Sequence, residues 1–454
     1  MKLTVIACSV MLSATICFGS FFGVVCSTDN RFATGPNNSH KLAYFTEENL
    51  ELERNAVTLV FQSQESIYLC VSGNGNPDHP WSRPIAYYPG KDPAITCGED
   101  IKPHLVWVMT DTANRRLNIF YRNLDYQMVP INVSGSNQDC YHPDVWADGS
   151  GFAHIVWEEE VAPAGKQIYY RKADTNGVSG EKFQVSNGFG FCGRPAIQRF
   201  GNEICVIWEQ YDPTQPYWFR IMRRRQVNGI WLAEEVLAQN RQPLAHPSLD
   251  FSLGGEHFSA CWDMTTCQDM NHVSNQEVFF YGGNPGGGFP TPGASTAPVM
   301  TTIEDEYSLY LWEEDSAGVK DIYADMYCHY RGWYYRGSLR RFLGLDEAIY
   351  APSSLGWVAV WTQGDSAPYK VMWCEFWPPV GTAEPVAPRT TRLKSTITNN
   401  LLKILDADQP SYLLNITGRK VLCLSPGTND ITGLKPGIYY LQTGKHRERL
   451  IVVR

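Results

Sequence analysis

Two sets of residues, nearly all polar, recur at fixed places in this 454-residue sequence and could form one site. The first set is acidic, and each member directly follows a tryptophan: Glu158, Glu209, Asp263 and Glu313. Each member of the second set directly precedes a proline: Asp92, His142, Arg194, His246 and Ala297. Such a group could bind a cation, a sugar or a peptide, and paired carboxylates could serve as acid and base in glycoside cleavage.

The elements that would position these residues repeat about every fifty residues. An aromatic residue ends a strand-like run in each copy: Phe61, Trp107, Trp157, Trp208, Trp262, Trp312 and Trp361. A residue that opens another run lies upstream: Pro93, Pro143, Pro195, Pro247, Pro298 and, in the last copy, Ala348. A third run follows each aromatic, and no helical pattern intervenes. A weaker fourth run follows in several copies, such as Arg83–Tyr88, Gln127–Val133, Glu181–Val185, Glu234–Ala238 and Gly337–Phe342. Four strands per unit are typical of a β-propeller blade, with the aromatics packed between blades.

We therefore predict an all-β fold with a propeller of seven blades. Six blades remain an alternative, because the first landmark is Phe61 rather than a tryptophan. In a four-stranded antiparallel blade, the start of strand one and the end of strand two share a face. The two polar sets should therefore meet at one mouth of the central channel.

The acidic set also has a structural explanation. A catalytic group is needed once, whereas an acidic residue in copy after copy suits acceptance of hydrogen bonds from backbone N–H groups. We therefore rank a structural role for the carboxylates first, ligand binding second and catalysis third.

The ends of the repeat array indicate how the ring closes. The last copy spans Ala348–Glu375, and the following Trp-Pro-Pro-Val-Gly segment cannot continue a central strand. This copy therefore lacks a fourth strand, and we predict that Leu42–Phe45 supplies it. The Gly- and Pro-rich segment Asn275–Pro298 predicts a loop or a poorly formed outer strand in the fifth copy.

The N-terminus resembles an export signal, with Lys2, the apolar run Leu3–Cys26 and then polar residues. We assign residues 1–27 to a signal peptide, 28–380 to the propeller, 381–400 to a linker and 401–454 to a small β-sandwich. Val25 and Ser27 suit a signal peptidase, and Gly19 or Ser20 would also do. An uncleaved membrane anchor is the alternative. The expected location is secreted or on the outer cell surface.

Composition limits the partners and cofactors. A net charge of −9, with 19% charged residues, argues against nucleic acid, and against a membrane once the signal is cleaved. Ten cysteines lie outside the assigned signal, without metal-site spacing. Buried free thiols are expected, and a Cys140–Cys192 disulfide is the alternative. No cofactor or metal is indicated, and a structural calcium ion stays open.

The C-terminal segment resembles the type A sorting domain of the bacterial type IX secretion system. The similarity lies in Leu414–Val421, Leu434–Tyr440 and Arg449–Val453, with Gly418, Arg419, Gly437 and Tyr439 as the sorting-motif residues. It implies the secretion machinery as a partner. A β-sandwich accessory module without a sorting role is the alternative.

The repeats resemble the sialidase-like propellers, of BNR type, of secreted bacterial proteins. The aspartate box of that family is not intact in any copy, and Asn228–Trp231 and Arg331–Trp333 are at most remnants of it. The resemblance, together with the predicted mouth, implies a module that binds an extracellular saccharide or protein. The alternative is a glycoside hydrolase or lyase that acts on an extracellular glycan.

Overall fold

The computed structural model divides the chain into two compact units. One is the propeller, Phe21–Phe376, and the other combines Met1–Ser20 with Trp377–Arg454. The structure describes residues 22–375 and 395–452, apart from these gaps: 36–39, 47–54, 73–80, 99–101, 125–128, 163–164, 188–189, 201, 213, 215–218, 252–257, 268–273, 282–287, 290–292, 304–306, 317, 329–331, 356–357, 399–400, 405–410, 415–419, 426, 432–433, 435–436 and 444–445.

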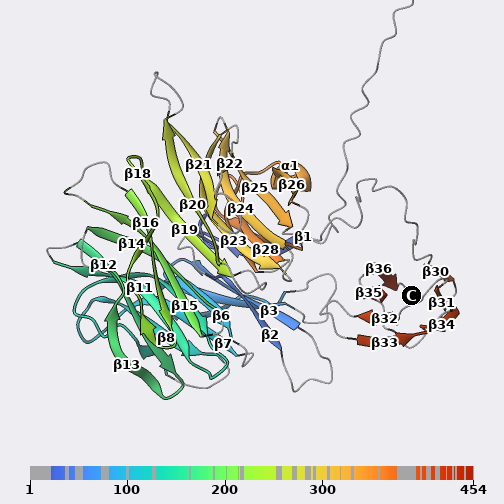
Figure 1. Cartoon of the computed structure of the whole chain (residues 1–454), viewed down its shortest axis with the longest axis horizontal. Helices are drawn as coiled ribbons and strands as arrows, with labels where there is room; N and C mark the ends of the chain where they lie inside the picture. The colour runs from blue at the N-terminus through green and yellow to red at the C-terminus, as the bar shows by residue number, and fades with distance from the viewer. Residues whose placement is uncertain are drawn as a thin grey trace, which may run out of the picture. The chain divides into compact units, whose positions relative to one another are not determined.

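Seven antiparallel sheets form the propeller, which confirms the predicted blade number (Figure 1). From the innermost strand outward, blade 1 comprises β2 (Leu42–Thr46), β3 (Asn55–Ser63), β4 (Ser66–Val71) and β5 (Ile85–Pro89). Blade 2 comprises β6 (Lys91–Cys97), β7 (Pro103–Thr110), β8 (Leu117–Asn123) and β9 (Ile131–Asn132). Blade 3 comprises β10 (Cys140–Ala147), β11 (Ala153–Val161), β12 (Gly165–Asp174) and β13 (Gly177–Gln184). Blade 4 comprises β14 (Phe191–Phe200), β15 (Glu203–Tyr211), β16 (Phe219–Val227), β17 (Ile230–Trp231) and β18 (Glu235–Asn240). Blade 5 comprises β19 (Leu244–Phe251), β20 (Phe258–Cys267), β21 (Ser274–Tyr281) and β22 (Gly288–Phe289). Blade 6 comprises β23 (Ala294–Ile303), β24 (Tyr307–Ser316), β25 (Val319–Cys328) and β26 (Gly332–Ser338). Blade 7 comprises β27 (Ile349–Leu355), β28 (Val358–Gln363), β29 (Tyr369–Glu375) and β1 (Phe22–Thr28).

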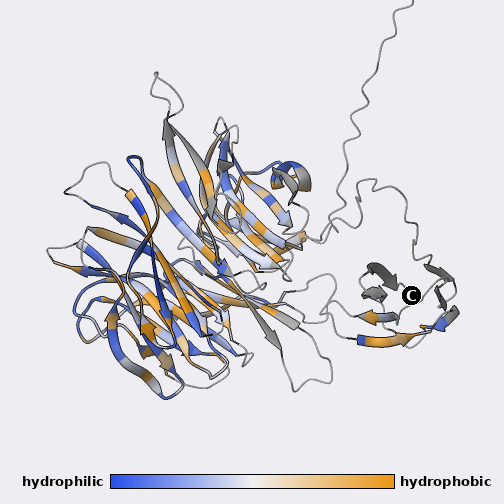
Figure 2. Cartoon of the chain, viewed as in Figure 1, coloured by the Kyte–Doolittle hydropathy of each residue, from blue (hydrophilic) through white to orange (hydrophobic). Residues whose placement is uncertain are grey.

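The aromatic landmarks fill the interfaces between blades, as predicted. None of the seven is more than 6% exposed. One cluster, for example, joins Val106 and Tyr121 of blade 2 to Val145 and Trp157 of blade 3. Hydrophobic residues recur along the strands of the blades (Figure 2). A blade cannot bury such a face alone, so the repeated tryptophan explains why the sequence forms a ring.

The prediction for ring closure is wrong. Strand β2, which contains Leu42–Phe45, is the innermost strand of blade 1. The fourth strand of blade 7 is instead β1, which pairs antiparallel with β29 from Phe22 opposite Cys374 to Thr28 opposite Tyr369. The apolar run Leu3–Cys26 concealed this strand, because its last residues read as part of a signal. The expected propeller boundary at residue 28 thus lies at the end of β1.

Two details, in blades 7 and 6, also differ from the expectation. The counterpart of the strand-opening prolines in blade 7 is Pro352, not Ala348, because the residue before it, Ala351, has the same backbone as the residues before the other prolines. In blade 6 the expected strand over residues 337–342 ends at Ser338, whose side chain caps the helix α1 (Leu339–Leu343). The loop or poorly formed outer strand expected over Asn275–Pro298 is found only in part: β22 has two residues, whereas the two ends of this range lie in β21 and β23.

The C-terminal unit contains two antiparallel sheets. One comprises β30 (Ser395–Thr398), β31 (Leu401–Ile404) and β34 (Gly427–Asp430); the other comprises β33 (Lys420–Leu424), β32 (Ser411–Leu414), β35 (Gly437–Thr443) and β36 (His446–Val452). Strand β30 lies inside the range 381–400 that we assigned to a linker. Gly437 and Tyr439 lie in β35, whereas Gly418 and Arg419 fall outside the described residues.

Within the described part of the chain, no helix has the length and apolar character needed to cross a bilayer. The cysteines recorded there are free thiols, so the Cys140–Cys192 disulfide is absent. Burial raises the pKa of Cys140 and of Cys192 to about 12. Because the thiolate is the reactive form, these two thiols are unreactive near neutral pH.

Candidate functional site

The residue before the strand-opening proline has the same unusual backbone in six blades. Its φ angle is positive: 49° for Asp92, 44° for His142, 47° for Arg194, 51° for His246, 50° for Ala297 and 55° for Ala351. Such angles are uncommon outside glycine, and a following proline normally favours extended backbone. The register of the first two strands shifts at each of these positions, as in a β-bulge. We call these six residues the mouth ring; five of them were predicted as a set.

The acidic residues that follow the tryptophans bind the mouth ring of the next blade. The backbone N–H of Arg194 donates to Glu158 (2.8 Å), that of His246 to Glu209 (3.1 Å), that of Ala297 to Asp263 (2.9 Å) and that of Ala351 to Glu313 (2.7 Å). We call these four carboxylates the mouth acids. Their expected structural role, acceptance of bonds from backbone N–H groups, is confirmed. In blade 1, Gln62 accepts in the same way from Asp92 (3.3 Å).

Two of the mouth acids also hold a histidine of their own blade. His142 Nδ1 lies 2.6 Å from Glu158 Oε1, and His246 Nδ1 lies 2.6 Å from Asp263 Oδ2. In both pairs the same carboxylate oxygen accepts from the next blade's N–H group. In each pair the carboxylate therefore orients the imidazole ring, and Nε2 remains as the second functional nitrogen of the histidine. Within the described part of the chain, neither Nε2 has a recorded partner.

Environment divides the mouth acids into two types. Burial tends to raise the pKa of Glu158, but the bond and charge of His142, with Lys166 at 2.8 Å, lower it to about 2. Glu158 is therefore ionised at neutral pH. Burial raises the pKa of Glu209, although the nearby charge of Arg194 opposes this. Burial also raises the pKa of Glu313, although the hydrogen bond from the Ala351 N–H opposes this. These two acids are easier to protonate.

The accessible side of the mouth carries two imidazoles and a guanidinium. The side chains of His142, Arg194 and His246 are 27%, 28% and 20% exposed, whereas those of Glu158 and Asp263 are each 3% exposed. Three other carboxylates at the mouth are partly exposed: Asp92, Glu209 and Glu313. The Glu209 side chain is 26% exposed and lies 3.9 Å from Arg194 Nε. A ligand at the mouth would thus meet the imidazole and guanidinium groups together with these three carboxylates.

A cationic aromatic corner adjoins His142. Lys166 Nζ lies 4.3 Å from the centre of the Tyr141 ring, and Lys91 Nζ lies 5.5 Å from the same ring. The Tyr141 hydroxyl donates to Glu160 (3.2 Å), which fixes the ring's position. The corner thus places two ammonium groups over one aromatic ring.

Gly193 allows two mouth acids to approach each other. A Cβ atom on this residue would lie 3.2 Å from Glu209 Oε1 and 3.4 Å from Glu158 Oε1. Both oxygens therefore face the same small space. A larger residue at position 193 would push against both carboxylates.

Asp92 joins a second polar group that sequence reasoning missed. Lys41 is 1% exposed, and its Nζ donates to the Pro93 carbonyl. Burial lowers the pKa of Lys41 to about 8, although the charges of Asp92 and Asp144 oppose this. His40 Nδ1 lies 3.1 Å from Asp144 Oδ1. The first innermost strand has no proline landmark, so Lys41 could not be aligned with the other blades.

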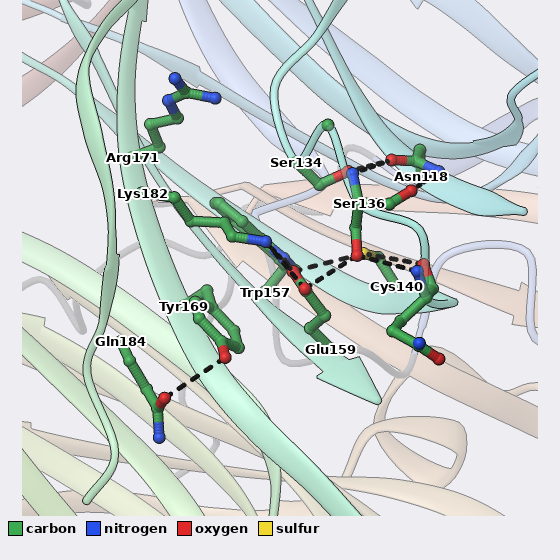
Figure 3. A network of polar contacts seen from close by, with 12 residues as sticks. Asn118, Ser134, Ser136, Cys140, Trp157, Glu159, Tyr169, Arg171, Lys182 and Gln184 are labelled. Atoms are coloured by element: carbon green, nitrogen blue, oxygen red, sulfur yellow. Dashed lines mark hydrogen bonds and ion pairs between the residues drawn. The ribbon is translucent and has the colours of Figure 1, made fainter. Parts of the chain in front are cut away.

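A carboxylate one residue beyond Glu158 has a different role. Glu159 is 5% exposed and accepts bonds from Ser136 Oγ (2.8 Å), Lys182 Nζ (2.8 Å) and Trp157 Nε1 (3.1 Å) (Figure 3). Successive residues of a strand point to opposite sides, which takes Glu159 away from the mouth. We assign it to the packing of blade 3. Among the described residues, no cluster of three or more His, Cys, Asp or Glu could hold a metal ion.

No protein-family model and no curated protein sequence matches this chain. Several solved structures are similar to it in fold. The β-propeller domain of the Trilobed protease from Pyrococcus furiosus shares 12% identity over 79% of this chain and 100% of that one, with a TM-score of 0.44. The polysaccharide lyase Uly1 shares 7% identity over 76% and 91%, with a TM-score of 0.47. The α-L-arabinanase of Penicillium chrysogenum shares 10% identity over 68% and 99%, with a TM-score of 0.42. The chain is thus a seven-bladed β-propeller with a small C-terminal β unit.

Proposed function

We propose that the protein binds an acidic glycan at the mouth ring. The observation that carries this proposal is the charge order at the mouth, where His142, Arg194 and His246 are accessible and two of their carboxylate partners are buried. A guanidinium binds a sugar carboxylate or sulfate through paired hydrogen bonds. The Arg194 guanidinium lies 3.9 Å from Glu209, so an acidic substituent of the sugar would add a second anionic partner to this exposed cation.

The corner at Tyr141 supports a sugar as the ligand. Lys91 and Lys166 lie over the Tyr141 ring, so their ammonium groups would meet the acidic substituents of a sugar bound beside this ring. A protein ligand would more often need a broad apolar core at its interface. The residues described at this mouth are mainly polar.

Cleavage of the bound glycan is a second candidate function. The observation that favours it is that carboxylates hold both histidines through Nδ1, which suits Nε2 for proton transfer. For a uronate, Nε2 would take the proton next to the sugar carboxylate. The electron pair would form a C=C bond as the C–O bond breaks, and a protonated Glu209 or Glu313 would donate to the leaving oxygen. Hydrolysis with the mouth acids is the alternative reaction.

The test compares an oligogalacturonate with its carboxyl-reduced, neutral counterpart. We expect calorimetric binding of the acidic oligosaccharide and at least a tenfold weaker signal for the neutral one, because the guanidinium contact is lost. Equal affinity for both would contradict the proposal. Mass spectrometry of the same mixtures separates the functions: intact ligand indicates binding alone, unsaturated products indicate elimination, and products that have gained water indicate hydrolysis.

We also propose export to the cell surface, with the C-terminal unit as a sorting module that engages the type IX secretion machinery. The N-terminal apolar run and the sorting-motif residues Gly418, Arg419, Gly437 and Tyr439 support this proposal. Cleavage near Gly19 or Ser20 fits the proposal better than cleavage near Ser27, because it keeps β1 in the mature protein.

A further inference from the structure

Two cysteines lie together where the ring closes. Cys26 belongs to β1, the closing strand of blade 7, and Cys70 belongs to β4 of blade 1. Cys70 is fully buried in the cluster between these blades, with Leu59 and Val371, and Cys26 is half-buried against that cluster. The two residues thus share one packed cluster, and the neighbouring Cys26 side chain, together with burial, raises the pKa of Cys70. This junction is special, because it joins the first and last blades of the ring.

We propose that Cys26 and Cys70 form a disulfide that locks the propeller ring when the protein meets an oxidising environment. The inference is independent of the glycan proposal. In the reduced state described above, both residues are free thiols in contact. Secreted and surface-exposed proteins keep such bonds, whereas cytosolic reductants would keep the pair open.

The chemistry requires a disulfide oxidant, such as oxidised glutathione. Cys26 is the more accessible partner, so its thiolate attacks a sulfur of the oxidant and releases one thiol. Cys70 then loses its proton and attacks the Cys26 sulfur, which releases the second thiol. The contact with Cys26 and burial hold the pKa of Cys70 far above its usual value, which disfavours the reverse order of attack. Overall, two protein thiols are oxidised and one disulfide is reduced.

The Cys26–Cys70 disulfide would oppose opening of the propeller ring. Strand β1 is held to blade 7 by its pairing with β29, and its half-buried residues Val25 and Cys26 pack on the cluster shared with blade 1. A covalent link between residues 26 and 70 restricts the opened chain, in which β1 would otherwise move freely. The oxidised ring should therefore be more stable than the reduced ring.

The experiment treats the purified full-length chain with oxidised glutathione or with a phosphine reductant. Peptide mapping should find a cross-linked peptide that contains Cys26 and Cys70, and the melting temperature should be about 5 °C higher in the oxidised sample. The Cys26→Ser variant should lose both the cross-link and the temperature difference. The Cys423→Ser variant is the control, because Cys423 is exposed in the other unit, and it should behave as the natural chain.

Absence of the cross-linked peptide after oxidation would overturn the proposal. So would a redox-dependent melting temperature that persists in Cys26→Ser. Neither result depends on a glycan, so failure here leaves the proposed function untouched. Equally, a chain without glycan affinity could still form the disulfide.

Discussion

A chain that begins at residue 29, and therefore lacks β1, is expected to melt at least about 10 °C below a chain that begins at residue 21. Without β1, the β29 edge loses its partner from Phe22 to Thr28, and the cluster around Cys70 loses Val25 and Cys26. An exposed strand edge also favours aggregation. Differential scanning calorimetry of the two chains measures the effect.

The same strand makes a prediction about export. N-terminal sequencing of protein from the native cell envelope should find a start at residue 20, 21 or 22, so that β1 is retained. A mature protein that starts at Asp29 and melts as high as the longer chain would contradict the role of β1 in closure.

Replacement of Glu158 by Ala is expected to cost about 3–5 kcal/mol of unfolding free energy at pH 7. Glu158 is 3% exposed and satisfies His142, Lys166 and the Arg194 N–H, so its loss leaves all three without their partner. Glu313→Ala is the matched control at the same position of blade 6. Its recorded hydrogen bond is the one from the Ala351 N–H, so about 1 kcal/mol is expected.

The cost of Glu158→Ala should depend on pH. The pKa of Glu158 is lowered from its ordinary 4.5 to about 2 in the folded chain. Its ionised form therefore stabilises the fold above about pH 4.5, and this contribution is lost as the pH falls toward 2. Urea unfolding at pH 7 and pH 3 should show a smaller difference between the natural chain and the variant at the lower pH. An equal difference at both values would show that Glu158 acts through packing rather than charge.

The sequence was sufficient for the blade number because interface packing leaves a periodic signal. Trp157 and its counterparts occupy the same place between blades, so they recur at nearly constant spacing. The mouth ring could be aligned for the same reason, since a proline marks His142, Arg194 and His246. Both signals come from structural requirements that every blade must meet.

Strand β1, which closes the ring, and Lys41 left no such periodic signal in the sequence. An edge strand packs on one side only, and Phe22–Thr28 overlaps an apolar run that reads as a signal. Lys41 directly precedes β2, an innermost strand that has no proline landmark. Ala351 was missed because blade 7 places its proline nearer to Trp361 than the other blades do. The contact between Cys26 and Cys70 depends on ring closure, which no local pattern reports.

The most direct test of the mouth as the ligand site is an affinity measurement on a triple variant, His142→Ala with Arg194→Ala and His246→Ala. Alanine already occupies this backbone at Ala297 and Ala351, so the fold should accept it. Calorimetric titration with an oligogalacturonate should show at least a hundredfold loss of affinity, because the guanidinium contact and two imidazole hydrogen bonds are removed. Unchanged affinity in a triple variant that keeps its melting temperature would contradict the account and place the ligand elsewhere on the protein.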